Sequence, residues 1–287
     1  MTAITVAVAQ RLELGESILW DGPRGLLAWV DIHKGDLWQG RPGAAPTCLT
    51  LPDRVGAIGL RADKPGHVVA LAKGFALVDA TGHVTPLAAI ETDRPGTRLN
   101  DGRSDPFGNF LCGGMRESGI EGSALYRLRP DGRVDRLLEG IGCANATCFS
   151  PDGGTLYFAD MPTGRIVAYP YHPDRPLGPG RLFFDFAGGP GLPDGATIDA
   201  EGCMWATHWG GGCITRHAPD GRVIARVALP VTNPTCLAFG GAGLDTLFIS
   251  TATFGLDAGR RDAEPLAGAV LALRCDVPGL PEPRFAG

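Results

Sequence analysis

Three residues with oxygen-bearing side chains, far apart along the chain, occur among apolar or small residues and outside the regular turns. Glu16 is flanked by apolar residues in LGESILW, Asn145 lies between small residues in GCANATC, and Asp194 precedes an apolar run in LPDGATI. A buried polar group needs a partner. Two carboxylates and one carboxamide suit a divalent cation, with water or substrate at the remaining positions. The sequence therefore predicts a cation site formed by Glu16, Asn145 and Asp194.

The stretch LPDGATIDAEGCMW contains two acidic turn signatures, and only one of them is needed to start a strand. Asp199 and Glu201 occupy the same repeat position as the turn at 105–108, so a turn explains both acids. Asp194 lies upstream, at the expected start of an inner strand, and is the candidate for chemistry. The alternatives are that 193–195 is another turn, that Glu16 caps a loop, and that Asn145 makes a turn hydrogen bond.

A second polar group lies in RPGTRLNDGRSDPFGNF. Arg98 offers a planar fork of donors, and Asn100 offers both a donor and acceptors. This pair suits a small molecule that carries hydroxyl or carboxylate groups. The alternative is that this stretch is a plain loop, in which Asp101-Gly102 forms a turn.

Short units of a turn followed by a strand are expected to position these side chains. They recur roughly every 40–50 residues, which is the period of a four-stranded propeller blade. The units are DGPRGLLAWVD (21–31), DKPGHVVALAKG (63–74), DPFGNFLCGGM (105–115), SPDGGTLYFAD (150–160), DAEGCMWATHWG (199–210) and GAGLDTLFIST (241–251). We predict an all-β, six-bladed β-propeller with four antiparallel strands per blade, forming a single domain over residues 1–287. The N-terminal run ITVAVAQ is expected to complete the last blade.

Charge and hydrophobic content indicate which kinds of partner the protein is not expected to bind. The net charge is -5, the pI is about 5.7, and 44% of the residues are hydrophobic. Without a basic cluster or a long apolar run, we expect no nucleic-acid partner and no membrane association. The opening residues lack the features of a secretory signal, so we expect a cytoplasmic protein, monomeric or weakly homo-oligomeric. The eight cysteines show no zinc-binding spacing and are interpreted as buried thiols.

The chain resembles the SMP-30/gluconolactonase/luciferin-regenerating-enzyme family, which includes regucalcin and bacterial sugar-lactone hydrolases. The resemblance spans nearly the whole length, in the order of the family's motifs. It is carried by LGESILWD, RLNDGRSDPFGNFLCGGM, SALYRLRPDG, NATCFSPDGGTLYFAD, LPDGATIDAEGCMWATHWGGGCITRHAPDG and LPVTNPTCLAFGGAGLDTLFISTA.

The resemblance implies a site in the propeller channel. One divalent metal would be held by Glu16, Asn145 and Asp194, with substrate contacted by Arg98 and Asn100. Its identity is left open among calcium, zinc, manganese, magnesium and ferrous iron. An acidic residue of the family binds substrate where this chain has Ser118. The chain departs from the family pattern at Ser118, which is not acidic, and at Ala146, which replaces a more familiar glycine. Glu117, beside Ser118, is the candidate for the acidic substrate-binding residue.

The activity implied is metal-dependent hydrolysis of a sugar (aldono)lactone to the aldonic acid, with Asp194 as the catalytic residue. One alternative is a metal-dependent esterase or organophosphate hydrolase that uses the same channel. Another is a propeller that binds calcium or a ligand without catalysis. The signature motifs of serine hydrolases, zincins and nucleotide-binding enzymes do not occur in the sequence.

Overall fold

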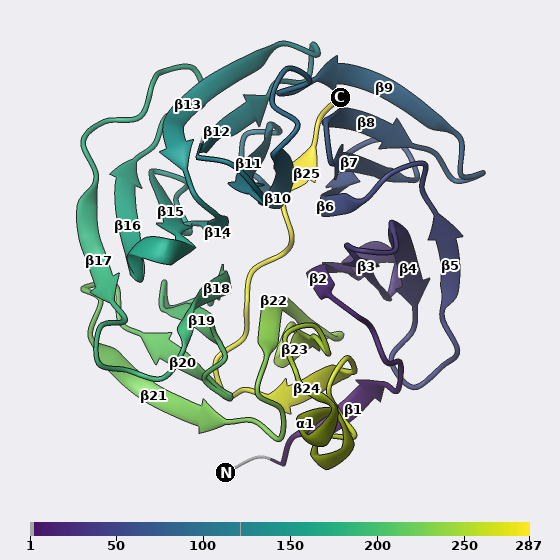
Figure 1. The fold of residues 1–287 in the computed structure, drawn as a ribbon, viewed down its shortest axis with the longest axis vertical. Coiled ribbons are helices and arrows are strands. Elements are labelled where there is room, and N and C mark those ends of the chain that lie inside the picture. Colours follow the sequence, from purple (N-terminus) through teal and green to yellow (C-terminus); the bar gives the residue numbers. More distant parts are fainter. Residues whose placement is uncertain (1–2, 121) are drawn as a thin grey trace.

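The computed structural model describes residues 3–120 and 122–287. Six antiparallel sheets are arranged as blades around a common axis (Figure 1). The predicted six-bladed β-propeller is therefore confirmed.

The strands of each blade follow one another from the axis outward in chain order, except that the outermost strand of the last blade is β1. The first three blades contain β2 (Gly15–Asp21), β3 (Leu26–Asp31), β4 (Asp36–Gly40) and β5 (Thr47–Thr50); β6 (Val55–Arg61), β7 (His67–Leu71), β8 (Gly74–Val78) and β9 (Val84–Ala89); and β10 (Thr97–Ser104), β11 (Phe110–Arg116), β12 (Ser123–Leu128) and β13 (Val134–Ile141). The last three contain β14 (Ala144–Phe149), β15 (Thr155–Asp160), β16 (Arg165–Pro170) and β17 (Arg181–Asp185); β18 (Leu192–Ile198), β19 (Met204–Trp209), β20 (Cys213–His217) and β21 (Val223–Ala228); and β22 (Pro234–Gly240), β23 (Thr246–Thr251), β24 (Val270–Arg274) and β1 (Thr5–Val8).

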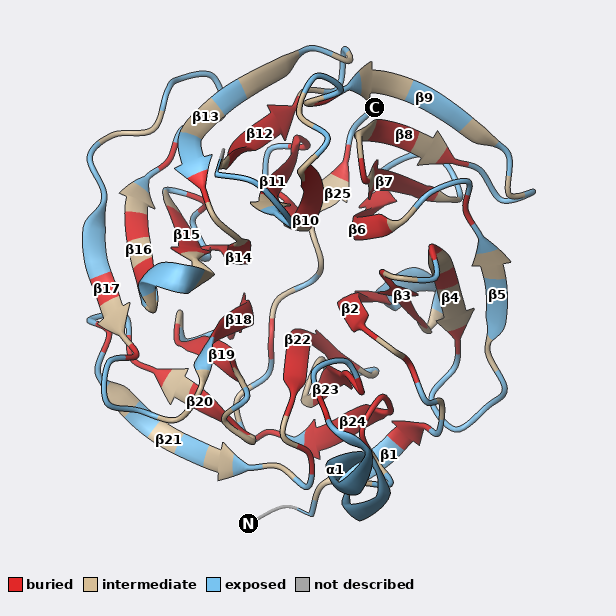
Figure 2. Ribbon diagram, viewed as in Figure 1, coloured by how far each residue is buried: buried red, intermediate tan, exposed pale blue. Residues whose placement is uncertain are grey.

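Burial decreases from the inner strands to the outer strands (Figure 2). Every residue of β6 and β22 is buried, whereas β21 alternates between half-buried and exposed residues. A strand covered on both faces reads as a nearly continuous apolar run, and a strand with one solvated face alternates. The apolar core lies between neighbouring blades: Leu19 of the first blade and Ile58 of the second belong to one cluster of buried side chains.

Both ends of the chain join blades that are remote in sequence. Strand β1 pairs with β24, so the N-terminal segment completes the last blade as predicted. A fifth strand, β25 (Arg284–Phe285), pairs in parallel with β6 and was not predicted. It ends a C-terminal tail, residues 276–287, which crosses the centre of the ring (Figure 1).

The tail lies at the end of the axis where the inner strands finish, which we call the turn end. Ala200 N donates to Pro278 O, Gly279 N donates to Leu244 O, and Ala286 N donates to Gly108 O. At the same end, the Arg103 guanidinium donates to Ala196 O at 2.9 Å and Leu237 O at 3.0 Å. It also forms an ion pair with Glu282 of the tail at 2.9 Å. The tail and Arg103 together tie blades across the axis.

Short helices occur only in connections of the described part of the chain. Two 3-10 turns, η1 (Gly22–Arg24) and η2 (Met161–Thr163), follow β2 and β15. The α-helix α1 (Ala258–Ala263) lies between β23 and β24, and the Asp257 side chain caps it by accepting from Arg260 N at 2.8 Å. Among residues 3–120 and 122–287, no helix has the length and apolarity needed to cross a membrane.

The prediction of buried thiols holds for six of the eight cysteines, all of which are free. It is wrong for Cys48, which is exposed on the outer strand β5, where one face meets solvent. Cys143 is half-buried and directly precedes β14.

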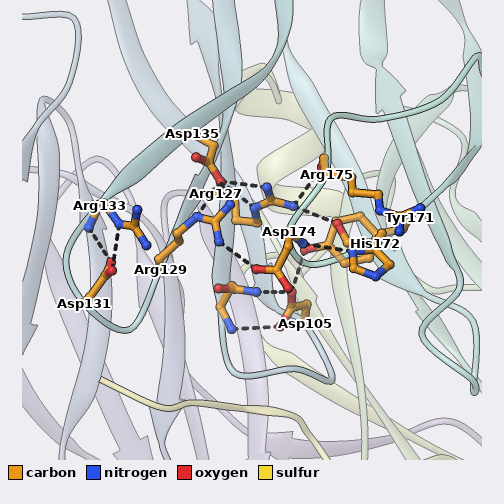
Figure 3. A network of polar contacts seen from close by, with 11 residues as sticks. Asp105, Arg127, Arg129, Asp131, Arg133, Asp135, Tyr171, His172, Asp174 and Arg175 are labelled. Carbon is orange, nitrogen blue, oxygen red and sulfur yellow. Dashed lines mark hydrogen bonds and ion pairs between the residues drawn. The ribbon is translucent and has the colours of Figure 1, made fainter.

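Arg127 of β12 anchors a polar cluster between the third and fourth blades (Figure 3). Its guanidinium is 2% exposed, donates to His172 O at 2.9 Å, and pairs with Asp135 at 2.7 Å. Arg129 binds the same Asp135 carboxylate at 2.8 Å and reaches Asp174 at 2.8 Å. The cluster thereby holds the long connection after β16 against the third blade.

This arrangement predicts a large difference between two arginines of the cluster. Arg127→Met should lower the free energy of unfolding by about 3 kcal/mol, because it leaves the His172 carbonyl without its donor and removes one of the two arginines that bind Asp135. Arg133→Met is the control, since Arg133 is 74% exposed and pairs only with the exposed Asp131; its unfolding midpoint should stay at the wild-type value. Denaturant unfolding measures both, and equal destabilisation would show that the cluster is not a structural anchor.

Candidate functional site

Each inner strand contains a register shift in its first half, at what we call the bulge end of the axis. There the ladder to the second strand of the blade is interrupted, as in a β-bulge, which bends a strand and redirects its side chains. The shifts lie at 16–19, 55–57, 99–102, 145–148, 193–196 and 234–237. Glu16, Asn100, Asn145 and Asp194 all lie at or within a shift. The repeated irregularity therefore places polar side chains from four blades at one level of the axis.

Two of these bulges contain a residue other than glycine in the left-handed region. Ser17 has φ 48° and Ala146 has φ 55°, and they directly follow Glu16 and Asn145. Such a conformation costs about 1–2 kcal/mol and persists only where the surroundings impose it. The Ser17 hydroxyl accepts a hydrogen bond from Ile58 N at 2.9 Å, which ties the first bulge to the second blade.

Asp101 plays the corresponding part for the bulge that carries Asn145. Its carboxylate accepts a hydrogen bond from Thr147 N at 2.8 Å, so the third blade fixes the backbone of the fourth. Asn100 adds a second tie between these blades, since its Nδ2 donates to Ala144 O at 2.8 Å. The blades thus hold one another in the register that the site requires.

Glu16 and Asp194 are buried carboxyls with raised pKa values. Burial, followed by the charge of Asp101, raises the pKa of Glu16 from 4.5 to about 8. Burial raises the pKa of Asp194 well above its usual range, and the charges of Glu16 and then Asp101 raise it further. Buried carboxyls keep their charge only when a partner compensates it.

Protein groups supply little of that compensation. Glu16 accepts one hydrogen bond, from Ser17 N at 3.3 Å, and the Asp194 carboxylate accepts none from the described residues. Asn145 Nδ2 lies 3.9 Å from Cys143 Sγ, so its Oδ1 is the atom left for another partner. Two carboxylates and one amide oxygen fit a hard divalent cation. Within the described part of the chain, no three His, Cys, Asp or Glu side chains gather into a metal-binding group. A cation held by Glu16 and Asp194 would take the Asn145 oxygen as its third donor.

Arg98, which the sequence predicts to bind substrate, is buried near these groups, and its charge acts on Glu16. Only 4% of its side chain is exposed. Its Nη1 donates to Leu99 O at 2.9 Å and to Asn100 Oδ1 at 2.7 Å, and its Nε contacts Glu117. Its Nη2 donates to no described residue, which leaves one fixed donor for a ligand.

Glu117 follows β11 and is the acidic residue that faces Arg98. Its Oε1 accepts from Arg98 Nε at 3.2 Å. Arg54, at the start of the second blade, donates to both carboxylate oxygens, at 2.5 Å and 2.9 Å. Ser118 is held by its backbone, whose N–H donates to Gly96 O at 3.2 Å. Of Glu117 and Ser118, it is therefore the side chain of Glu117 that contacts Arg98.

The Asp199 carboxylate, unlike that of Asp194, accepts several hydrogen bonds from residues of its own blade. Its Oδ1 accepts from the backbone N–H groups of Glu201 and Cys203, each at 3.0 Å. Its Oδ2 accepts from Trp205 Nε1 at 3.0 Å and Arg216 Nε at 2.8 Å. The turn interpretation of Asp199 is confirmed.

Three further residues belong to this region, and sequence patterns did not single them out for it. Asp101 was interpreted as part of a turn, yet it sits within the bulge and raises the pKa of both buried carboxyls. Cys143 lies close enough to Asp194 that this charge, after burial, raises the pKa of the thiol to about 12. Arg54 had no signal beyond its place before the second inner strand. The one sequence feature that could have pointed to Asp101 was its position next to Asn100, a predicted substrate-binding residue.

The comparison with known families bears directly on this site. Residues 14–253 match the family described as "SMP-30/Gluconolactonase/LRE-like region". The chain belongs to this family. Among SMP-30/gluconolactonase/LRE proteins, it is 38% identical to a 6-deoxy-6-sulfogluconolactonase of Pseudomonas putida, with 98% of this chain and 97% of that protein covered. It is 35% identical to an L-arabinolactonase of Azospirillum brasilense, with 99% and 95% covered.

A solved structure of the family has nearly the same fold. The calcium-binding protein regucalcin of Agrobacterium tumefaciens superimposes with a TM-score of 0.93 at 33% identity, covering 99% of this chain and 97% of that chain. Sugar lactonases and a calcium-binding protein thus share this family's propeller.

The perturbed carboxyls predict a pH-dependent stability for cation-free protein. Since the folded-state pKa of Glu16, about 8, lies above its usual 4.5, folding takes up protons. The contribution of Glu16 to the free energy of unfolding is fully present below about pH 4.5 and is lost as the pH rises towards 8. Glu16→Gln should therefore melt higher than wild type, by a margin that grows by about 3 °C or more from pH 5 to pH 8.

Differential scanning calorimetry in a chelator measures this margin. The control is Glu139→Gln, which removes an exposed carboxylate and should show no such growth. A divalent cation should raise the wild-type melting temperature more at pH 8 than at pH 5, because the ionised carboxyls bind it. A constant margin across this range would refute the burial of an uncompensated Glu16 charge.

Proposed function

We propose that the protein hydrolyses a sugar lactone to its aldonic acid, with a divalent cation held by Glu16, Asn145 and Asp194. The observation that carries the proposal is the pair of buried carboxyls, Glu16 and Asp194, whose pKa values are both raised by burial and which form no ion pair with a described residue. Support also comes from the relatives, which include two proteins named as sugar lactonases.

Each residue has a role that follows from its contacts. A bound divalent cation would supply Lewis-acid polarisation of the lactone carbonyl. Asp194 accepts a proton from the attacking water, because its carboxylate has no competing donor within the described residues. Arg98 directs its unpaired Nη2 N–H to a substrate oxygen, and Glu117 accepts hydrogen bonds from sugar hydroxyls. Asn100 holds Arg98 in place through the 2.7 Å contact with Nη1.

The substrate panel follows from the relatives and from the site. One relative is named for a gluconolactone with a sulfonate at carbon 6, so sulfonated lactones belong beside neutral hexono- and pentonolactones. Aryl esters and phosphotriesters test the broader ester-hydrolase alternative. The oxygen donors accept calcium, zinc, manganese, magnesium or ferrous iron, so each cation is added back to chelator-treated protein. Acid release above the spontaneous rate supports the proposal, whereas calcium binding without acid release would replace it with a binding function.

Asp194 and Asp199 form a matched pair for a test by mutation. Asp194→Asn should lower kcat on the preferred lactone by about 100-fold or more, since it removes the proton acceptor and a cation ligand. Its melting temperature should not fall, because no hydrogen bond from the described residues is lost.

Asp199→Asn should have the reverse profile. It weakens buried contacts to Arg216 and Trp205, so it should cost about 2 kcal/mol of stability while folded molecules keep their turnover. Steady-state kinetics and thermal unfolding of both variants check this. Full lactonase activity in Asp194→Asn would remove Asp194 from the mechanism.

A further inference from the structure

A group of three charged side chains stands beside the candidate site on the side of the second and third blades. The Glu117 carboxylate is bound by Arg54 at 2.5 Å and 2.9 Å and by Arg98 at 3.2 Å. Arg98 is almost fully buried, but the Arg54 side chain is 36% exposed. Arg54 Nε donates to no described residue, so it remains available to an incoming ligand.

The charges of this group do not cancel. Two guanidinium groups share one carboxylate, which leaves one net positive charge. Asp53 is the other carboxylate near Arg54, but it is exposed and its Oδ1 accepts from the Arg54 backbone N–H at 2.8 Å. Solvent screens the charge of an exposed group more than that of a buried one. Without Arg54, the Glu117–Arg98 pair would be neutral.

Arg54 is not needed to hold Glu117 in position. The Glu117 backbone N–H donates to Gly96 O at 2.8 Å, and that of Ser118 donates to the same oxygen at 3.2 Å. Arg98 contacts the carboxylate independently. The main contribution of Arg54 is therefore its charge.

We propose that Arg54 is a specificity-determining residue that favours lactones with an oxyanion group, a carboxylate or a sulfonate, remote from the lactone carbonyl. This inference rests on the proposed function. The carboxylates of Glu16, Asp101 and Asp194 oppose a negative substituent at the cation end of the site. Arg54 and Arg98 attract it on the side of Glu117, so charge favours one orientation of such a substrate.

The test compares lactones that differ only in this charge. Glucono-1,5-lactone is assayed beside its analogues with a sulfonate or a carboxylate at carbon 6. In Arg54→Gln, the ratio of kcat/KM for an anionic lactone to kcat/KM for the neutral one should fall roughly tenfold. Arg54→Lys keeps the charge and should restore most of the ratio. The fall should shrink at high salt, because the attraction is electrostatic.

Arg41→Gln is the matched control. It removes one exposed positive charge at the turn end, where Arg41 donates to Gly25 O at 3.4 Å, and should leave the ratio unchanged. An equal loss for neutral and anionic lactones in Arg54→Gln would overturn the inference, because Arg54 would then act only through Glu117. A response limited to the sulfonate or to the carboxylate supports the inference and identifies the anion.

A binding experiment separates this inference from the proposed function. Calorimetry with the corresponding neutral and anionic lactams measures the ratio of their binding affinities, without turnover. The ratio is compared between wild type and Arg54→Gln. If lactams bind with the expected ratio but no lactone is hydrolysed, the inference stands and the proposed function fails. If lactones are hydrolysed with no change in either ratio, the inference alone fails. If the protein neither binds lactams nor hydrolyses lactones, both are overturned.

Discussion

The burial of two interacting carboxyls, neither of which forms an ion pair with a described residue, is the constraint on which the site depends. Glu16 and Asp194 lie on the first and fifth blades. Burial raises the pKa of both, and the charge of Glu16 raises that of Asp194 further. Left alone, these groups favour the neutral form or repel one another. Both strands are fixed in buried blades, so the two carboxyls cannot move apart. Binding of a positive charge would relieve their repulsion.

The bulges convert a repetitive fold into a specific site. Six inner strands bulge at the same level, but only some of them carry a group that can bind a ligand. Ties such as Asp101 to Thr147 N and Ser17 to Ile58 N make each bulge dependent on its neighbouring blade. The left-handed residues Ser17 and Ala146 are held by this mutual support. Precision in the site thus comes from contacts between blades as well as from pairing within them.

Much of the fold was predictable because turn residues and apolar strands repeat along the chain. The closure of the last blade by the N-terminal run followed from the same count of strands. The contrast between Asp194 and Asp199 was predictable too, since only Asp199 had a repeat equivalent in a turn. The catalytic and cation-binding roles of Asp194 remain predictions.

The remaining features depend on contacts over long sequence separations, which no local pattern encodes. Arg54 meets Glu117 only because the second and third blades are neighbours. Asp101 has the local signature of a turn, but its neighbours in space make it part of the charged centre. The pairing of β25 with β6 joins residues at opposite ends of the sequence and has no repeat from which to infer it.

The C-terminal tail gives the axis two unlike ends. Arg103 of β10 and Glu282 of the tail form an ion pair whose side chains are only 8% and 11% exposed. The tail covers that end, so the contacts that brace the ring and the side chains of the candidate site lie at opposite ends of the axis.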